Sequence, residues 1–185
     1  MDVKKFIELS KVAQKLKRVK RTGWVLENIP LPESVADHSF GTAFMAMILA
    51  KELNLDQLKV MKMALIHDLA EAIVGDIVTV NGKEILDNYA EKIALEMKTM
   101  GDISNITGDQ EIVELFTELE ENTTAEARLV KQIDKVEMAL QTLEYEKQEN
   151  KDLTAFFESV EVRVHDPLIK DIFDQIVEER EFNAS

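Results

Sequence analysis

The chain has 185 residues, of which 45% are hydrophobic, so it is long and apolar enough for one folded domain with a sizeable core. Its net charge of −14 argues against a nucleic-acid polymer as the main partner, because the two would repel each other. The chain has no cysteine, which excludes disulfides, thiolate metal sites and cysteine nucleophiles and leaves histidines and carboxylates to bind any metal.

The first 21 residues are basic, with eight Lys or Arg against two acidic residues. Apolar spacing predicts a helix over 3–18 within this segment, which we treat as an N-terminal basic helix spanning 1–21. The basic residues form either a solvated helix face or a local positive end beside a small anion.

The rest of the chain shows apolar residues at helical spacing, without repeats or a linker that would divide it. Ser34, Asn54, Thr107, Thr123 and Asp166 are expected to mark helix starts. The strand-like run 72–82 has no partner run, so we expect a loop closed by Asn81 and Gly82. The expected helices cover 34–53, 56–72, 83–100, 109–121, 124–149, 153–162 and 167–181, which makes the fold all-α.

A membrane partner is not expected. The longest uninterrupted apolar run, 43–50, is far shorter than the roughly 20 residues of a membrane span. The first residues lack the apolar segment of a signal peptide, and we therefore expect a cytoplasmic protein.

Ionisable residues interrupt the apolar helix expected at 56–72. His67 and Glu71 share one helix face, and Asp68 lies beside both. Charges among apolar neighbours are costly unless they are paired or bind a cation. A histidine bonded to a backbone carbonyl beside a salt-bridged aspartate is the alternative to a metal site.

Two further residues extend this pattern. His38 lies in the first turn of the helix expected at 34–53, ahead of an apolar stripe, and Asp134 shares the face of Val130, Ile133 and Met138. Together with His67 and Asp68 they form an ordered set on three helices.

This set resembles the signature of the HD superfamily of metal-dependent phosphohydrolases. The segments "KLKRVKRTGWV", "PESVADHS", "ALIHDLAEAIVGDI" and "KQIDKVEMALQTLEYE" are similar to the 5′-deoxynucleotidases of the HD domain-containing protein 2 group and their bacterial YfbR-type relatives, over about 10–150. The resemblance implies a single HD domain over 1–185, with a metal-binding core at about 30–150 and the helix at 167–181 packed on it. The implied metal ligands are His38, His67, Asp68 and Asp134.

The resemblance also implies catalytic or substrate-contacting roles for Glu71 and Asp76, and nucleotide binding by Arg21 and Trp24. Glu71 is placed to orient or deprotonate water. Asp76 would bond a sugar hydroxyl or protonate the leaving 5′ oxygen, unless it is only a helix-ending turn residue. Arginine suits a phosphate, and tryptophan would stack on a base or pack beside a deoxyribose. A core tryptophan beside a surface arginine is the alternative.

Two imidazoles and two carboxylates leave open positions on a divalent ion, which is typical of a catalytic site. Two-metal HD centres generally recruit further histidines, and this chain has three, so we expect one ion, such as Mn, Co, Fe or Zn. His165 lies outside the matched motifs and is expected at the surface or at a helix entry.

The sequence is thus interpreted as a cytoplasmic phosphomonoesterase that hydrolyses deoxyribonucleoside 5′-monophosphates. Another HD nucleotide phosphohydrolase or phosphodiesterase, or a non-catalytic helical metal-binding module, is the alternative. The apolar surplus on 124–149 makes a homodimer plausible.

Overall fold

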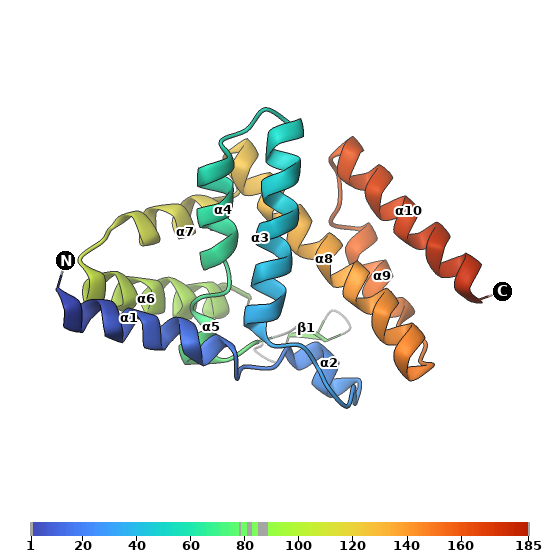
Figure 1. The fold of residues 1–185 in the computed structure, drawn as a ribbon, viewed down its shortest axis with the longest axis horizontal. Coiled ribbons are helices and arrows are strands. Elements are labelled where there is room, and N and C mark those ends of the chain that lie inside the picture. The colour runs from blue at the N-terminus through green and yellow to red at the C-terminus, as the bar shows by residue number, and fades with distance from the viewer. Residues whose placement is uncertain (1, 78, 81–82, 85–88, 185) are drawn as a thin grey trace.

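The computed structural model describes residues 2–77, 79–80, 83–84 and 89–184. Helices α3 (Val35–Glu52) and α4 (Gln57–Ile66) stand side by side in the middle of the molecule and both pack against the long helix α8 (Ala125–Glu149) (Figure 1). The N-terminus and the C-terminus lie at opposite ends of the long axis.

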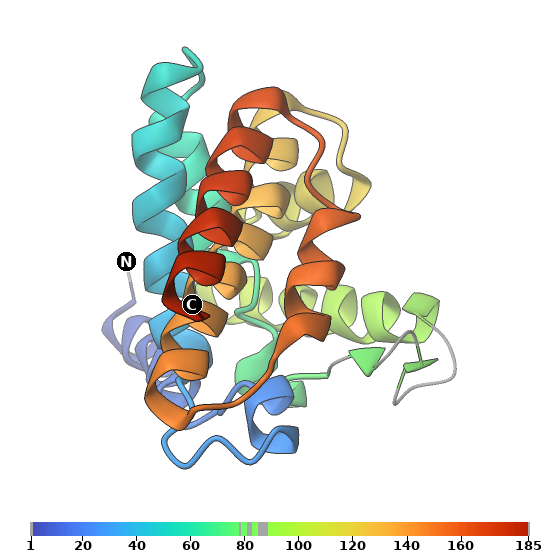
Figure 2. The ribbon, with the colours of Figure 1, turned by 90° about the vertical axis from the view of Figure 1, so that its right-hand side faces the viewer.

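The remaining helices cover the two ends of this centre. α9 and α10 pack against α8 on the side of the C-terminus (Figure 2), and α1, α6 and α7 lie on the side of the N-terminus. Helices make up most of the described residues, so the all-α prediction is confirmed. The bounds are α1 Val3–Leu16, α2 Thr22–Leu26, α5 Glu71–Val74, α6 Tyr89–Thr107, α7 Glu111–Glu121, α9 Thr154–Glu161 and α10 Pro167–Ala184.

The start of α3 is fixed by a capping box, as the sequence predicts. Ser34 Oγ accepts a hydrogen bond from the Asp37 backbone at 3.2 Å, and Asp37 Oδ2 accepts one from the Ser34 backbone at 2.8 Å. Asp166 likewise accepts from the first backbone N–H groups of α10. The box fixes the first turn of α3, which carries His38.

Three other predicted helix starts are wrong. Asp56, not Asn54, caps α4 with its carboxylate, and Asn54 takes a left-handed φ of 55° that ends the preceding turn. Thr124 caps α8 instead of Thr123, and Thr107 is the last residue of α6. The expected starts lie one to three residues from the observed N-caps Asp56, Gln110 and Thr124, because only the local geometry decides which residue takes the capping position.

The single helix expected at 56–72 is divided. α4 ends at Ile66, a tight turn follows over 67–70, and the short helix α5 begins at Glu71. Within the turn, the Leu69 backbone N–H bonds the Ile66 carbonyl and the Glu71 N–H bonds the Asp68 carbonyl, at 3.0 Å each. These bonds to the third preceding residue tighten the chain as in a 3₁₀-helix. His67 and Asp68 therefore lie on a turn, not on a continuous helix face.

The prediction of a loop over 72–82 is also wrong in part. Strand β1 (Thr79–Val80) pairs antiparallel with strand β2 (Lys83–Glu84), so the strand-like run does have a partner. Residues 83–84 are consequently not helical, and α6 begins at Tyr89 and continues to Thr107 rather than spanning 83–100. The expected turn at 81–82 lies outside the described residues. An Asn-Gly pair between short runs is the typical hairpin signal that would have predicted this pairing.

The N-terminal segment contains a second helix that the sequence analysis missed. α1 ends at Leu16, and the five-residue helix α2 follows with Arg21 as its N-cap and Trp24 inside it. An isolated bridge between Lys20 and Ser34 connects this segment to the start of α3. Arg21 is thereby held beside the first turn of α3.

The buried side chains form two large clusters and one small cluster. The largest joins α3, α4, α7, α8, α9 and α10, where Ala43, Ala46 and Ala50 let α3 approach its neighbours closely. The second lies under α1, between α5, α6 and α7. The small cluster contains Trp24, Ile29, Tyr145 and Leu153. The start of α3 and the turn after α4 lie where these clusters meet.

Apolar residues of α8 are mostly used inside the chain. Val130, Ile133, Val136 and Ala139 are buried, so the apolar surplus on 124–149 does not by itself indicate a dimer surface. The exposed apolar row is instead on α3, and it consists of Phe40, Phe44 and Ile48. Among the described residues, no helix has the length and hydropathy that a membrane span requires.

Candidate metal centre and active site

The four residues predicted as metal ligands come together from three parts of the fold. His38 lies near the start of α3, His67 and Asp68 on the turn after α4, and Asp134 in the middle of α8. His38 Nε2 is 3.1 Å from Asp134 Oδ1 and 3.3 Å from His67 Nε2. Asp68 Oδ2 is 3.2 Å from His67 Nε2. We call these four residues the His/Asp cluster.

Both histidine rings are oriented by a hydrogen bond on the side away from the cluster. His67 Nδ1 donates to the Ala64 carbonyl at 2.7 Å, and His38 Nδ1 donates to the Glu137 carboxylate. Because both partners are acceptors, each Nδ1 carries a proton. The two Nε2 atoms are therefore directed at each other and at the cluster carboxylates.

This donor set fits a divalent cation. Ligand atoms about 2.0–2.2 Å from a central ion lie about 3 Å from one another when their bonds are at right angles, which the observed separations match. Burial and the Arg21 charge lower the pKa of His38, but its hydrogen bonds to Asp134 and Glu137 outweigh them and raise the pKa to about 9. In the metal-free protein, the protonated His38 ring therefore supplies positive charge between Asp134 and Glu137. A bound cation would replace that proton.

Arg21 lies beside the His/Asp cluster. Its Nη1 lies 3.2 Å from Asp68 Oδ2 and 3.9 Å from Asp76 Oδ1, and only 14% of its side chain is exposed. Burial lowers the pKa of Arg21, but the charges of Asp68 and Asp76 outweigh this effect and raise it. The guanidinium is therefore a fixed positive charge at the edge of the His/Asp cluster.

Glu71 opens α5 and is 2% exposed. Its Oε2 is buried and has no hydrogen-bond partner among the described residues. Burial, followed by the charges of Asp68 and Asp76, raises the pKa of Glu71 well above its ordinary value. A buried carboxyl with a raised pKa beside a donor set of this kind is typical of a group that accepts and releases a proton near neutral pH.

Asp76 follows α5 and joins this helix to α2. Gly75 ends α5 with a positive φ of 81°, which glycine adopts without strain, and turns the chain at Asp76. Asp76 Oδ2 accepts a hydrogen bond from the Thr22 backbone at 2.5 Å, and the Thr22 hydroxyl donates to the Asp76 carbonyl at 2.7 Å. Asp76 therefore fixes the start of α2, next to Arg21.

Trp24 is not at the centre of the site. It is 2% exposed, stacks on Phe156 with ring centroids 4.3 Å apart, and meets Tyr145 edge to face at 5.2 Å. Its Nε1 donates to Glu33 Oε1 at 2.8 Å. The ring is therefore enclosed by protein side chains in this arrangement, and direct contact with a nucleotide stays a prediction.

The sequence analysis missed two charged residues at the site. Glu137 lies three residues after Asp134 on α8, and this spacing on one helix face would have pointed to it. Lys92 comes from α6, where its Nζ donates to the Ile77 carbonyl at 3.0 Å and lies 3.5 Å from Glu96. No sequence signal links Lys92 to the site, because its contacts depend on how α6 packs beside α5.

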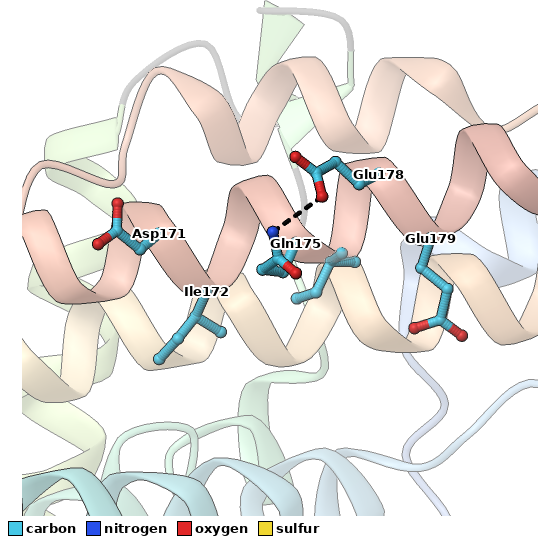
Figure 3. A pocket seen from close by; sticks show the side chains of 6 residues that line it. Asp171, Ile172, Gln175, Glu178 and Glu179 are labelled. Carbon is cyan, nitrogen blue, oxygen red and sulfur yellow. Dashed lines mark hydrogen bonds between the residues drawn. The ribbon is translucent and has the colours of Figure 1, made fainter.

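Two other features lie apart from the His/Asp cluster. His165 is exposed before α10, and its backbone donates to Gln132 Oε1 at 2.7 Å, as expected for a residue at a helix entry. A surface hollow follows α10, and Figure 3 shows Gln175 bonded to Glu178 there. Because the hollow carries acidic side chains, it is unsuited to a phosphate. Its lining consists of Asp171, Ile172, Gln175, Ile176, Glu178 and Glu179.

Fold and site together define an all-α protein with a buried His/Asp site suited to a divalent cation. The HD domain family model matches residues 13–176, which is most of the chain. The chain therefore belongs to the HD domain family.

Similar proteins match almost the whole chain. It is 43% identical to the 5′-deoxynucleotidase HDDC2 of Dictyostelium discoideum, over 95% of this chain and 98% of that protein. It is 37% identical to the 5′-deoxynucleotidase HDDC2 of Homo sapiens, over 97% and 88%. Among solved structures, a conserved hypothetical protein from Pyrococcus furiosus has a TM-score of 0.79 at 36% identity, over 93% of this chain and 99% of that chain.

Proposed function

We propose that this protein is a metal-dependent 5′-deoxynucleotidase, which hydrolyses deoxyribonucleoside 5′-monophosphates to deoxynucleosides and phosphate. The observation that carries the proposal is the convergence of His38, His67 and Asp134, whose ligand atoms all lie within 4.8 Å of one another. Relatives named 5′-deoxynucleotidase, similar over nearly the full chain, support the choice of substrate.

His38, His67, Asp68 and Asp134 would hold one divalent ion, such as Mn, Co, Fe or Zn, because imidazole and carboxylate ligands accept each of these. When bound, such an ion lowers the pKa of a coordinated water and polarises a phosphoryl oxygen.

Glu71 takes a proton from the attacking water in this proposal. The water oxygen forms a bond to phosphorus while the bond from phosphorus to the 5′ oxygen breaks, and the proton held by Glu71 passes to that leaving oxygen. The raised pKa of Glu71 suits both transfers, because a carboxyl that is easily protonated is the better base and still releases the proton to an alkoxide.

Arg21 and Asp76 bind the substrate in this proposal. The Arg21 guanidinium donates to phosphate oxygens and offsets their charge, on a protein that is otherwise negative. Asp76 already accepts from the Thr22 backbone and faces Arg21, so it remains an acceptor and bonds a sugar hydroxyl.

The proposal includes a homodimer formed through α3. Phe40, Phe44 and Ile48 are 70%, 53% and 46% exposed, and the two phenyl rings stack with centroids 6.4 Å apart. A continuous apolar row of this kind is typical of a surface that a partner covers. We also assign the protein to the cytoplasm, because charged nucleotides do not cross membranes unaided, and we expect no nucleic-acid polymer or membrane as partner.

A substrate screen tests this function. Phosphate release from dAMP is compared with release from AMP, dATP and a cyclic dinucleotide, each with Mn²⁺, Co²⁺, Zn²⁺ or chelator. We expect metal-dependent release from the deoxynucleoside monophosphate above the others. Preference for dATP or the cyclic dinucleotide would indicate another HD phosphohydrolase, and no release from any of them would indicate a non-catalytic metal-binding module.

A further inference from the structure

The side of His38 away from the His/Asp cluster is enclosed by carboxylates. His38 is completely buried, and its Nδ1 is bonded to Glu137 Oε2. Glu33, Glu137 and His38 each place one ligand-type atom within 4.8 Å of the others. Glu33 and Glu137 therefore form a layer directly behind this predicted ligand.

Glu33 is held on its far side by two aromatic residues. Trp24 Nε1 donates to Glu33 Oε1 at 2.8 Å, and the Glu33 backbone donates to the Tyr145 hydroxyl at 2.7 Å. Trp24 and Tyr145 are buried and in edge-to-face contact, with Phe156 stacked on the indole. Trp24 and Tyr145 thus hold Glu33 in its place near Glu137 and His38.

We propose that Glu137 is the positioning residue for the metal ligand His38, and that Trp24 and Tyr145 hold Glu33 in the layer behind this ligand. The proposal rests on the proposed function, because it requires that His38 binds the metal.

The physical basis is control of the imidazole. A carboxylate that accepts from Nδ1 keeps the proton on that nitrogen, directs the Nε2 lone pair at the metal position and makes the ring a stronger ligand. Loss of such a partner typically lowers metal affinity by about 10–100-fold. It does not change contacts with the substrate, so KM at saturating metal is expected to stay near its original value.

The first test titrates the purified full-length protein with Mn²⁺ after chelator treatment and measures bound metal. Glu137→Met keeps the side-chain length but removes the acceptor, whereas Glu137→Gln keeps an acceptor oxygen. We expect Glu137→Met to weaken Mn²⁺ binding about 10–100-fold, with Glu137→Gln closer to the parent. Glu144→Met and Glu144→Gln are matched controls at an exposed position of the same helix, and both should bind Mn²⁺ as the parent does.

The outcomes separate this inference from the proposed function. A parent protein that binds no divalent metal would remove the proposed function itself. A parent that binds Mn²⁺ together with a folded Glu137→Met variant of unchanged affinity would overturn only the inference. If Glu137→Met does not fold, Glu137→Ala is used in its place, and its affinity decides in the same way.

The second test concerns Trp24. Trp24→Phe keeps an aromatic ring against Phe156 but removes the N–H that donates to Glu33, so we expect weaker Mn²⁺ binding. Glu33→Gln should weaken Mn²⁺ binding as well. A folded Trp24→Phe variant with normal Mn²⁺ affinity would overturn this part of the inference.

Discussion

Replacing Glu71 with glutamine should reduce activity and stabilise the protein at the same time. The amide has nearly the same shape as the carboxyl but cannot take a proton from water. We expect kcat to fall by about 10²–10⁴, the usual range for a lost general base. That loss corresponds to about 2.7–5.4 kcal/mol of transition-state stabilisation.

The stability change follows from the surroundings of Glu71. Its buried Oε2 has no hydrogen-bond partner among the described residues, and an unsatisfied buried acceptor costs about 1–3 kcal/mol. Burial and the charges of Asp68 and Asp76 also disfavour its ionised form. The neutral amide carries no charge beside these acids and offers N–H donors in place of the unsatisfied acceptor. The metal-free Glu71→Gln variant should therefore gain up to about 1–3 kcal/mol at pH 7, with each kcal/mol raising Tm by about 2–4 °C.

The pH dependence of this gain has a definite sign. A carboxyl whose pKa is raised in the folded protein makes its full contribution to stability below its unfolded pKa and loses it as pH rises through the folded pKa. The parent protein therefore loses stability as the pH rises above 4.5, the ordinary pKa of a glutamate carboxyl. The stability advantage of Glu71→Gln over the parent should disappear at more acidic pH.

Two sets of measurements test these expectations. Thermal melting of the metal-free protein at several pH values gives the change in stability, and single-turnover kinetics with the metal content of the loaded enzyme give the change in activity. Glu121→Gln provides the same chemical change at an exposed position and should alter neither property. A Glu71→Gln variant with full metal content and a near-normal rate would remove Glu71 from the mechanism. Lower stability at pH 7 would show that its carboxylate is favourably paired in solution.

The remaining predictions concern the metal, the phosphate and the dimer. Treatment with a chelator, or the substitution Asp134→Ala, should abolish phosphate release. Added Mn²⁺ should raise Tm in the parent protein but not in the Asp134→Ala variant. Phosphate release by metal-free protein would contradict the metal site. Arg21→Ala should raise KM for dAMP at least tenfold. Arg21→Lys should recover only part of this loss, because one ammonium replaces a bidentate guanidinium. An unchanged KM would limit the role of Arg21 to its ion pair with Asp68. Phe44→Glu should halve the molar mass measured by light scattering while leaving kcat intact, and a parent that is already monomeric would refute the dimer.

Much of the site could be predicted from the sequence because its residues are chemically unusual for the segments in which they lie. Histidines and acids inside apolar helical segments need a cation or a partner wherever the helices lie. This made His38, His67, Asp68 and Asp134 candidates, and the resemblance to the HD superfamily grouped them as one ligand set. The cap at Ser34 was equally readable, since a capping box involves only neighbouring residues.

The sequence by itself determined the helical class of the fold, because helical periodicity is a property of short stretches. It also offered the candidate residues of the cluster, which the ordered motif of the HD superfamily joined into one set. Tertiary structure alone decided the rest. The end of α4 at Ile66 turns His67 and Asp68 toward α3. Trp24 is buried because Tyr145 and Phe156, more than 100 residues later in the chain, pack against its ring. Glu137 shares a helix face with Asp134, but it becomes the partner of His38, 99 residues away, only because α8 packs against α3.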